Sequence, residues 1–123
     1  MNPQLLARLI AVGRAGIGVL AISDPTRALG PWIGPESSRG PARLLGRALG
    51  ARDLVLAAGA LRSAGDTDAL RPWLAAGVLA DCVDFTATAV ADDIPWRGRA
   101  FVLALAGGAV AAGAVALAQL DQP

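Results

Sequence analysis

The chain has no histidine, no lysine and no tyrosine, and a single cysteine, Cys82, among its 123 residues. Without histidine it lacks the usual general base, the commonest metal ligand and the side chain that changes charge near neutral pH. One cysteine allows neither an intrachain disulfide nor a pair of thiols for redox chemistry. We therefore expect no enzymatic activity, no cofactor and no metal site.

An excess of charge of one sign is also missing, since 11 basic residues face 10 acidic ones and the net charge is +1. The basic residues are all arginines and are scattered along the chain. This balance gives no field strong enough to attract a polyanion, so we expect no binding to nucleic acid. Abundant arginine, alanine and glycine indicate a GC-rich bacterial source.

Apolar residues make up 54% of the chain, more than the about 45 to 50% of ordinary soluble domains. They concentrate in four segments, each long enough as a helix to cross about 30 Å of hydrocarbon. The predicted helices cover residues 4–22, 42–62, 69–91 and 98–120. We therefore predict one all-α domain over residues 1–123, a four-helix transmembrane bundle with antiparallel, up-down connections.

The connections add detail to this prediction. Ser23-Asp24-Pro25 is typical of a helix start and predicts a short interfacial helix through Leu29. The connection at residues 63–68 is short, which predicts that the second and third helices are antiparallel neighbours. The first segment loosely resembles a signal peptide, but Arg8 and Arg14 interrupt its apolar run, so a retained helix is favoured.

Small residues recur every four positions along two of the predicted helices. In lipid this pattern lets helix backbones approach closely. The residues are Ala42, Gly46 and Gly50 in the second helix, and Ala100, Ala104, Gly108, Ala112 and Ala116 in the fourth. The pattern predicts tight helix packing on these faces.

Charged residues lie in the middle of three predicted spans, where a lone charge costs roughly 2.5 to 3.5 kcal/mol or more. Counting from Asp66 in the short connection, Arg52 lies 14 residues back and Asp81 lies 15 residues forward. Equal rise per residue places the two at about the same depth. We predict an intramembrane polar cluster of Arg14, Arg47, Arg52, Asp53, Asp81 and Asp84.

Helical geometry also predicts how these charges pair. Arg52 and Asp53 are adjacent and diverge by about 100°, so they point toward different neighbours. The expected pairs are Arg52 with Asp81 or Asp84, and Asp53 with Arg14 or Arg47. Two interpretations of the cluster stay open. It is either an ion network that fixes helix register and pairing, or a proton relay or the lining of a small polar cavity.

Two stretches carry distinctive motifs. Residues 47–54 contain Gly50-x-Arg52-Asp53, and the segment that begins at Trp73 contains Asp81-x-x-Asp84. With these motifs the chain resembles a family of small bacterial four-helix membrane proteins known as a domain of unknown function. The resemblance implies a four-span membrane fold, more distantly similar to small quinol-oxidase-associated membrane proteins. It implies no activity and no ligand.

The function predicted from the sequence is that of a small integral protein of the bacterial inner membrane, of structural or accessory type. Its expected partners are the lipid bilayer and either further copies of itself or a larger membrane complex. The alternative is a transporter or a proton- or ion-conducting module that uses Arg52, Asp81 and Asp84. A soluble all-α bundle with unusually apolar helices is a further alternative, because charges dilute three of the four segments.

Overall fold

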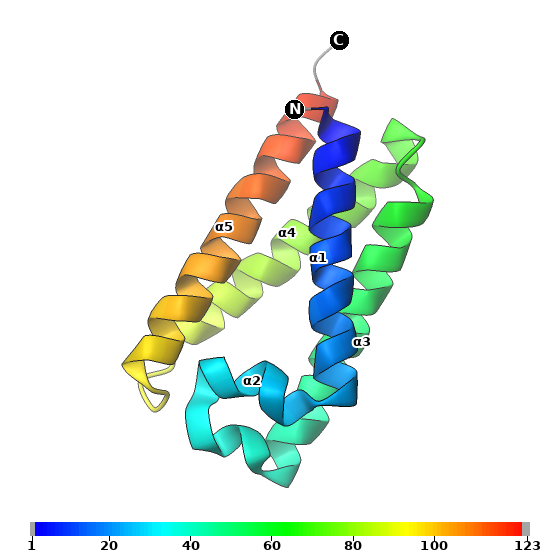
Figure 1. The fold of residues 1–123 in the computed structure, drawn as a ribbon. Coiled ribbons are helices and arrows are strands. Elements are labelled where there is room, and N and C mark those ends of the chain that lie inside the picture. The colour runs from blue at the N-terminus through cyan, green and yellow to red at the C-terminus, as the bar shows by residue number, and fades with distance from the viewer. Residues whose placement is uncertain (1, 122–123) are drawn as a thin grey trace.

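The computed structural model describes residues 2–121, which form five α-helices and one 3₁₀ helix without any strand in that range (Figure 1). The elements are α1 (Pro3–Ser23), α2 (Pro25–Ile33), η1 (Gly34–Ser38), α3 (Gly40–Arg62), α4 (Thr67–Val90) and α5 (Trp96–Leu120). The all-helical class is as predicted, and the four long helices match the predicted segments to within two residues at each end. The fifth helix, α2, is the predicted short helix and continues to Ile33.

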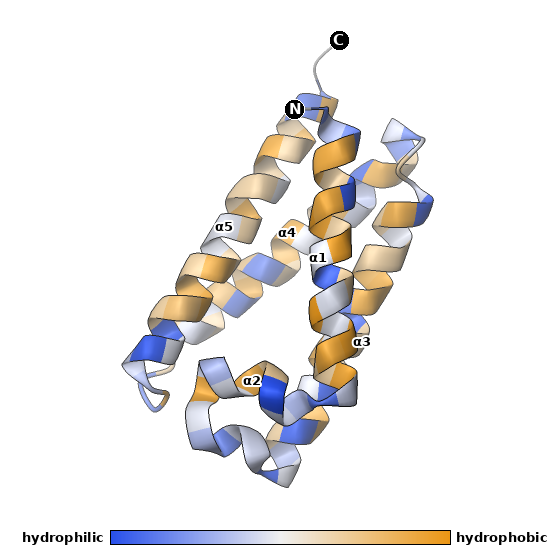
Figure 2. Ribbon diagram, in the orientation of Figure 1, coloured by the Kyte–Doolittle hydropathy of each residue, from blue (hydrophilic) through white to orange (hydrophobic). Residues whose placement is uncertain are grey.

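Three helices of the described chain are long and apolar enough to cross a membrane, namely α1, α4 and α5. Helix α3, which covers the fourth predicted span at residues 42–62, is not among them, so the four-span part of the prediction is not confirmed. Helix α3 is long enough, with 23 residues. Its hydropathy is lowered by the charged residues Arg43, Arg47, Arg52, Asp53 and Arg62, and Figure 2 shows hydrophilic segments interrupting this helix.

Aspartate side chains fix where two of the helices begin. A carboxylate oxygen of Asp24 accepts a hydrogen bond from the backbone N–H of Arg27 at 3.1 Å, which caps α2. Asp66 accepts from the backbone N–H groups of Asp68 and Ala69, at 3.0 and 3.1 Å, and caps α4. Each cap satisfies N–H groups that have no partner within the first helical turn.

The four long helices run alternately in opposite directions, and the start of α1 and the end of α5 lie at the same end of the molecule (Figure 1). Helix α1 packs most extensively on α3, α4 packs on α5, and α2 contacts α1, α3 and α5. Helices α3 and α4 contact each other as predicted, but they diverge away from their connecting turn (Figure 1). Figure 1 also shows that α1 and α5 separate toward α2.

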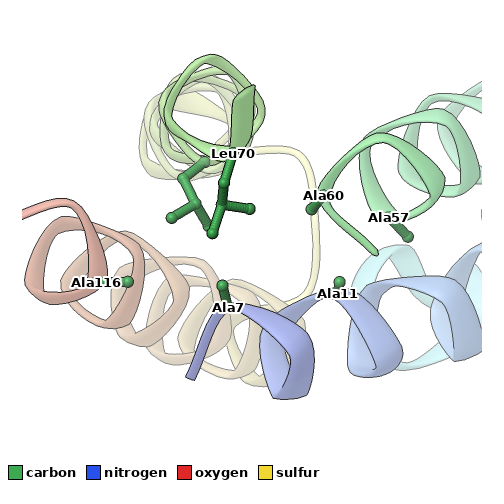
Figure 3. Close-up of a cluster of buried hydrophobic side chains, with 7 residues drawn as sticks. Ala7, Ala11, Ala57, Ala60, Leu70 and Ala116 are labelled. Atoms are coloured by element: carbon green, nitrogen blue, oxygen red, sulfur yellow. The ribbon is translucent and has the colours of Figure 1, made fainter. Parts of the chain in front are cut away.

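Small side chains dominate the core, which joins the four long helices near the chain ends (Figure 3). This core consists of Ala7, Ala11, Ala57, Ala60, Leu70, Leu74 and Ala116. Large apolar side chains point outward instead, and Val12, Leu44 and Leu79 are 60%, 69% and 66% exposed. Small residues inside and large apolar residues outside are typical of helices that pack in lipid.

Glycines make the closest contact between α1 and α3. A Cβ atom on Gly18 would lie 2.8 Å from the carbonyl oxygen of Gly50, and one on Gly50 would lie 2.7 Å from the carbonyl oxygen of Gly18. Gly46, one turn earlier on α3, is buried against Leu29 of α2. The small-residue pattern of α3 therefore marks a packing face, as predicted.

The corresponding pattern on α5 has a different outcome. Of its five small residues only Ala116 is fully buried between helices. Ala104, Gly108 and Ala112 instead line a cavity. The packing prediction fails for these three positions because α1 and α5 diverge there and no helix covers the stripe.

Candidate functional site

The centre of the molecule contains an arginine held between two carboxylates from different helices. Nη1 of Arg14, on α1, donates to Oδ1 of Asp53 on α3 at 3.0 Å, and Nη2 donates to Oδ2 of Asp81 on α4 at 2.6 Å. The three side chains are only 10%, 11% and 11% exposed. The Arg14 guanidinium thus links α1 to both α3 and α4 near the midpoints of the three helices.

Arg52 precedes Asp53 on α3 and extends these contacts to Asp84, which lies about one turn after Asp81 on α4. Its Nη1 and Nη2 atoms donate to the two carboxylate oxygens of Asp84, at 2.9 and 2.7 Å, a bidentate pair. Its Nε and Nη2 atoms also reach Oδ1 of Asp53, at 3.3 and 3.1 Å. The Arg52 and Asp84 side chains are 30% and 20% exposed, so this end is the more open one.

These five residues form an alternating chain, Asp81–Arg14–Asp53–Arg52–Asp84, which we call the charge network. Arg52 contacts Asp84 and Asp53 contacts Arg14, which are two of the pairs expected from the sequence. Two arginines and three aspartates give the network a formal charge of −1. The network therefore has one aspartate more than it has arginines, and this excess negative charge is not neutralised within it.

Arg47, the sixth residue of the predicted cluster, lies outside the charge network. Its side chain is exposed, and it makes no salt bridge with any of residues 2–121. It precedes Asp53 by six positions, which places it about 120° away around α3. Sequence reasoning had matched its depth only loosely and had not fixed its direction around the helix.

A cavity of about 530 Å³ opens beside the charge network, and all five network residues line it. Its remaining walls are mostly apolar and come from α1, α2, α3 and α5. Representative wall residues are Leu9, Ile17, Trp32, Phe101 and Leu105. A small polar cavity beside these charges was one of the alternatives predicted from the sequence, but the size of this cavity and its largely apolar walls were not predicted.

A second, much smaller cavity of about 20 Å³ reaches the same network from the side of the chain ends. It is lined by Ala7 and Ala60 of the core together with Trp73. Arg14 and Asp81 line both cavities, so these two residues lie between them. Its volume has room for about one water molecule.

No group of three or more cysteine, aspartate or glutamate side chains in residues 2–121 is arranged to hold a metal ion. The aspartates of the charge network are separated by arginines, which occupy the positions a cation would take between them. The site is therefore an organised ion network next to a largely apolar cavity.

No protein-family model, no curated protein and no solved structure matches this chain. The resemblance to a family of small four-helix membrane proteins therefore stays a prediction. The geometry of the charge network and its cavity is what carries the functional argument.

Proposed function

We propose that this chain is a small multi-pass protein of the bacterial inner membrane, of structural or accessory type. In this proposal α1, α3, α4 and α5 cross the bilayer as a four-helix bundle, and the charge network holds them in register. The protein acts alone, as a homo-oligomer or within a larger membrane complex.

One observation carries this proposal: buried arginines pair with aspartates at mid-helix, while large apolar side chains cover the outside. In lipid, charged groups face the inside of a bundle and pair with each other. Removing one partner of a buried pair is strongly destabilising, whereas an intact pair specifies which helices meet. The arrangement suits a protein whose first task is to keep a defined shape in the membrane.

Including α3 as a fourth span is supported by its outward face. Leu44, Leu45 and Val55 of α3 are 69%, 63% and 60% exposed, which is how side chains that face lipid are expected to lie. Arg52 and Asp53 are neutralised within the charge network. The arginines near the ends of this helix have long apolar stems that allow their charges to reach the headgroup region.

Two glycines that bracket α3 provide the test. Gly40 and Gly65 are exposed, and a Cβ atom at either position would have no neighbour within 4 Å. In a Cys82→Ala background, we expect Gly40→Cys and Gly65→Cys to react with a membrane-impermeant maleimide from opposite sides of the membrane. Labelling from the same side would show that α3 does not cross. Recovery of the protein without detergent would overturn the membrane proposal altogether.

A second candidate function is proton or ion conduction, and the two cavities favour it. Arg14 and Asp81 line both cavities, so water in either cavity would contact this ionisable pair. Under this proposal wild-type protein in liposomes dissipates a pH gradient, and Asp81→Asn abolishes the flux while the helical content is retained. Asp92→Asn, an exposed substitution, serves as the control. An absence of flux in wild-type liposomes would leave the structural role alone.

A further inference from the structure

We infer that the 530 Å³ cavity beside the charge network is a binding site for a hydrophobic organic cation, such as an ammonium or phosphonium ion that carries apolar groups. This inference rests on the proposed membrane location of the chain and adds a ligand class to it. Small-molecule sites have volumes of about 300 to 1,000 Å³, so the cavity is of a suitable size.

The sign of the ligand charge follows from the hydrogen bonds of the charge network. Both Nη atoms of Arg14 and of Arg52 already donate to aspartates. An anion entering the cavity would have to compete with these carboxylates and would meet a net negative charge. A cation would balance the one excess negative charge of the network.

Free acceptor atoms point to the same conclusion. Among the described residues, no hydrogen bond reaches Oδ2 of Asp53 or Oδ1 of Asp81, although both residues are only 8% exposed. Both residues line the cavity. Neither oxygen is among the fully buried oxygens that lack a partner, so both atoms are accessible and available to a cationic or N–H-bearing ligand.

The walls determine that the cation is hydrophobic rather than a hydrated ion. Leu9, Ile17 and Leu105 line the cavity and are unable to replace the water shell of a metal ion. Trp32 and Phe101 also line it, and aromatic rings attract organic cations. A ligand with one positive charge and several apolar groups would satisfy both parts of the site.

The test compares two ions of the same shape and opposite charge, tetraphenylphosphonium and tetraphenylborate, in uncharged maltoside micelles. We expect saturable binding of tetraphenylphosphonium at one site per chain and no saturable binding of tetraphenylborate. Equal binding of the two ions, or no saturable binding of the phosphonium ion, overturns the inference. A protein that is soluble without detergent overturns the membrane proposal separately, and the ions are then compared in buffer.

A matched pair of glycines on α1 locates the site. Gly13 lines the cavity and Gly16 does not, yet at both positions a Cβ atom would have no neighbour within 4 Å. We expect Gly13→Phe to fill the cavity and to weaken tetraphenylphosphonium binding by roughly tenfold or more, since apolar volume is lost. Gly16→Phe is expected to bind as wild type. Unchanged binding in Gly13→Phe would contradict the location.

The charge requirement is tested with Asp84→Asn, which keeps the shape of the side chain and makes the network neutral. We expect on the order of a tenfold loss of phosphonium affinity, since the negative charge that attracts the bound cation is removed. The Gly13→Phe comparison keeps the inference falsifiable if this variant fails to fold. Added phosphatidylethanolamine, with phosphatidylglycerol as control, tests the source of the natural cation. If that cation is a lipid amine, phosphatidylethanolamine displaces the phosphonium probe. If it is a free amine, the added lipid leaves the probe bound.

Discussion

Arg14 and Asp81 lie 67 positions apart in the sequence, and Nη2 of the arginine donates to Oδ2 of the aspartate at 2.6 Å. The same guanidinium donates to Asp53 through Nη1. Because Arg14 is the only bridge in the charge network between α1 and the other two helices, it is the residue on which the network most depends. Its contacts lead to the first prediction.

We expect Arg14→Met to lower the free energy of unfolding by about 3 to 5 kcal/mol, because it leaves buried Asp81 without a partner and Asp53 with Arg52 alone. Unfolding in mixed micelles, followed by loss of helical signal, would measure this effect. Arg8→Met is the control, since Arg8 is exposed, and its expected effect is within about 0.5 kcal/mol. Adding Asp53→Asn and Asp81→Asn should restore part of the loss. A mild effect of Arg14→Met would mean that the network contributes little to stability.

The bidentate pair of Arg52 and Asp84 is predicted to be energetically coupled. Arg52→Leu and Asp84→Leu should each destabilise the protein, and the double variant should be no less stable than the worse single one. The expected coupling is about 0.5 to 3 kcal/mol for residues in one ion network. Additive losses would contradict the pairing.

The exposed pair of Arg71 and Asp121 provides a control for that double-mutant cycle. The two side chains are 41% and 60% exposed. An exposed ion pair contributes about 0 to 1 kcal/mol, because water screens it and side-chain entropy opposes it. A coupling at Arg71 and Asp121 as large as that at Arg52 and Asp84 would show that the cycle reports something other than burial.

The glycine contact between α1 and α3 gives a third prediction. In Gly50→Ala the new Cβ atom would lie 2.7 Å from the carbonyl oxygen of Gly18, so the two backbones must move apart. We expect a loss of about 1 to 3 kcal/mol, as for other overpacked interiors. Gly16→Ala has open space around its Cβ atom, and it should gain about 0.4 to 1 kcal/mol through helix propensity. Thermal unfolding of both variants in the same detergent would compare them.

The depth of the charged residues was predictable because helical rise and the short turn at Asp66 fix it. The choice between Asp81 and Asp84 as the partner of Arg52 was not predictable. The two aspartates are three positions apart on one helical face, so the splay of α4 from α3 decides which one Arg52 meets. The direction of Arg47 around α3 needed the helix rotation, which depth alone does not give.

The long helices were predictable for a different reason, since apolar segments and capping residues are local signals. The size and the apolar walls of the cavity were not, because they arise from the angle between α1 and α5. Small residues at Ala104 and Gly108 read in sequence as a packing face, and they become a cavity wall only because no helix covers them. The same small-residue pattern is therefore a packing face on α3 and a cavity wall on α5, because the arrangement of the neighbouring helices differs.

The last prediction concerns the contact that holds α2 against α5. A Cβ atom on Gly98 would overlap the carbonyl oxygen of Trp32, so Gly98→Ala should push α2 away from the start of α5. We expect a loss of about 1 to 3 kcal/mol from this overlap. The fluorescence of Trp32 should shift to longer wavelength in a background that lacks Trp73 and Trp96, because the indole gains contact with water. Gly108→Ala on the same helix, where a Cβ atom meets open space, should leave the Trp32 fluorescence unchanged. Like Gly16→Ala, it should gain about 0.4 to 1 kcal/mol rather than lose stability. If Gly98→Ala behaved like Gly108→Ala, α2 would not be anchored at this point, and the cavity that Trp32 lines would lack a fixed wall at that end.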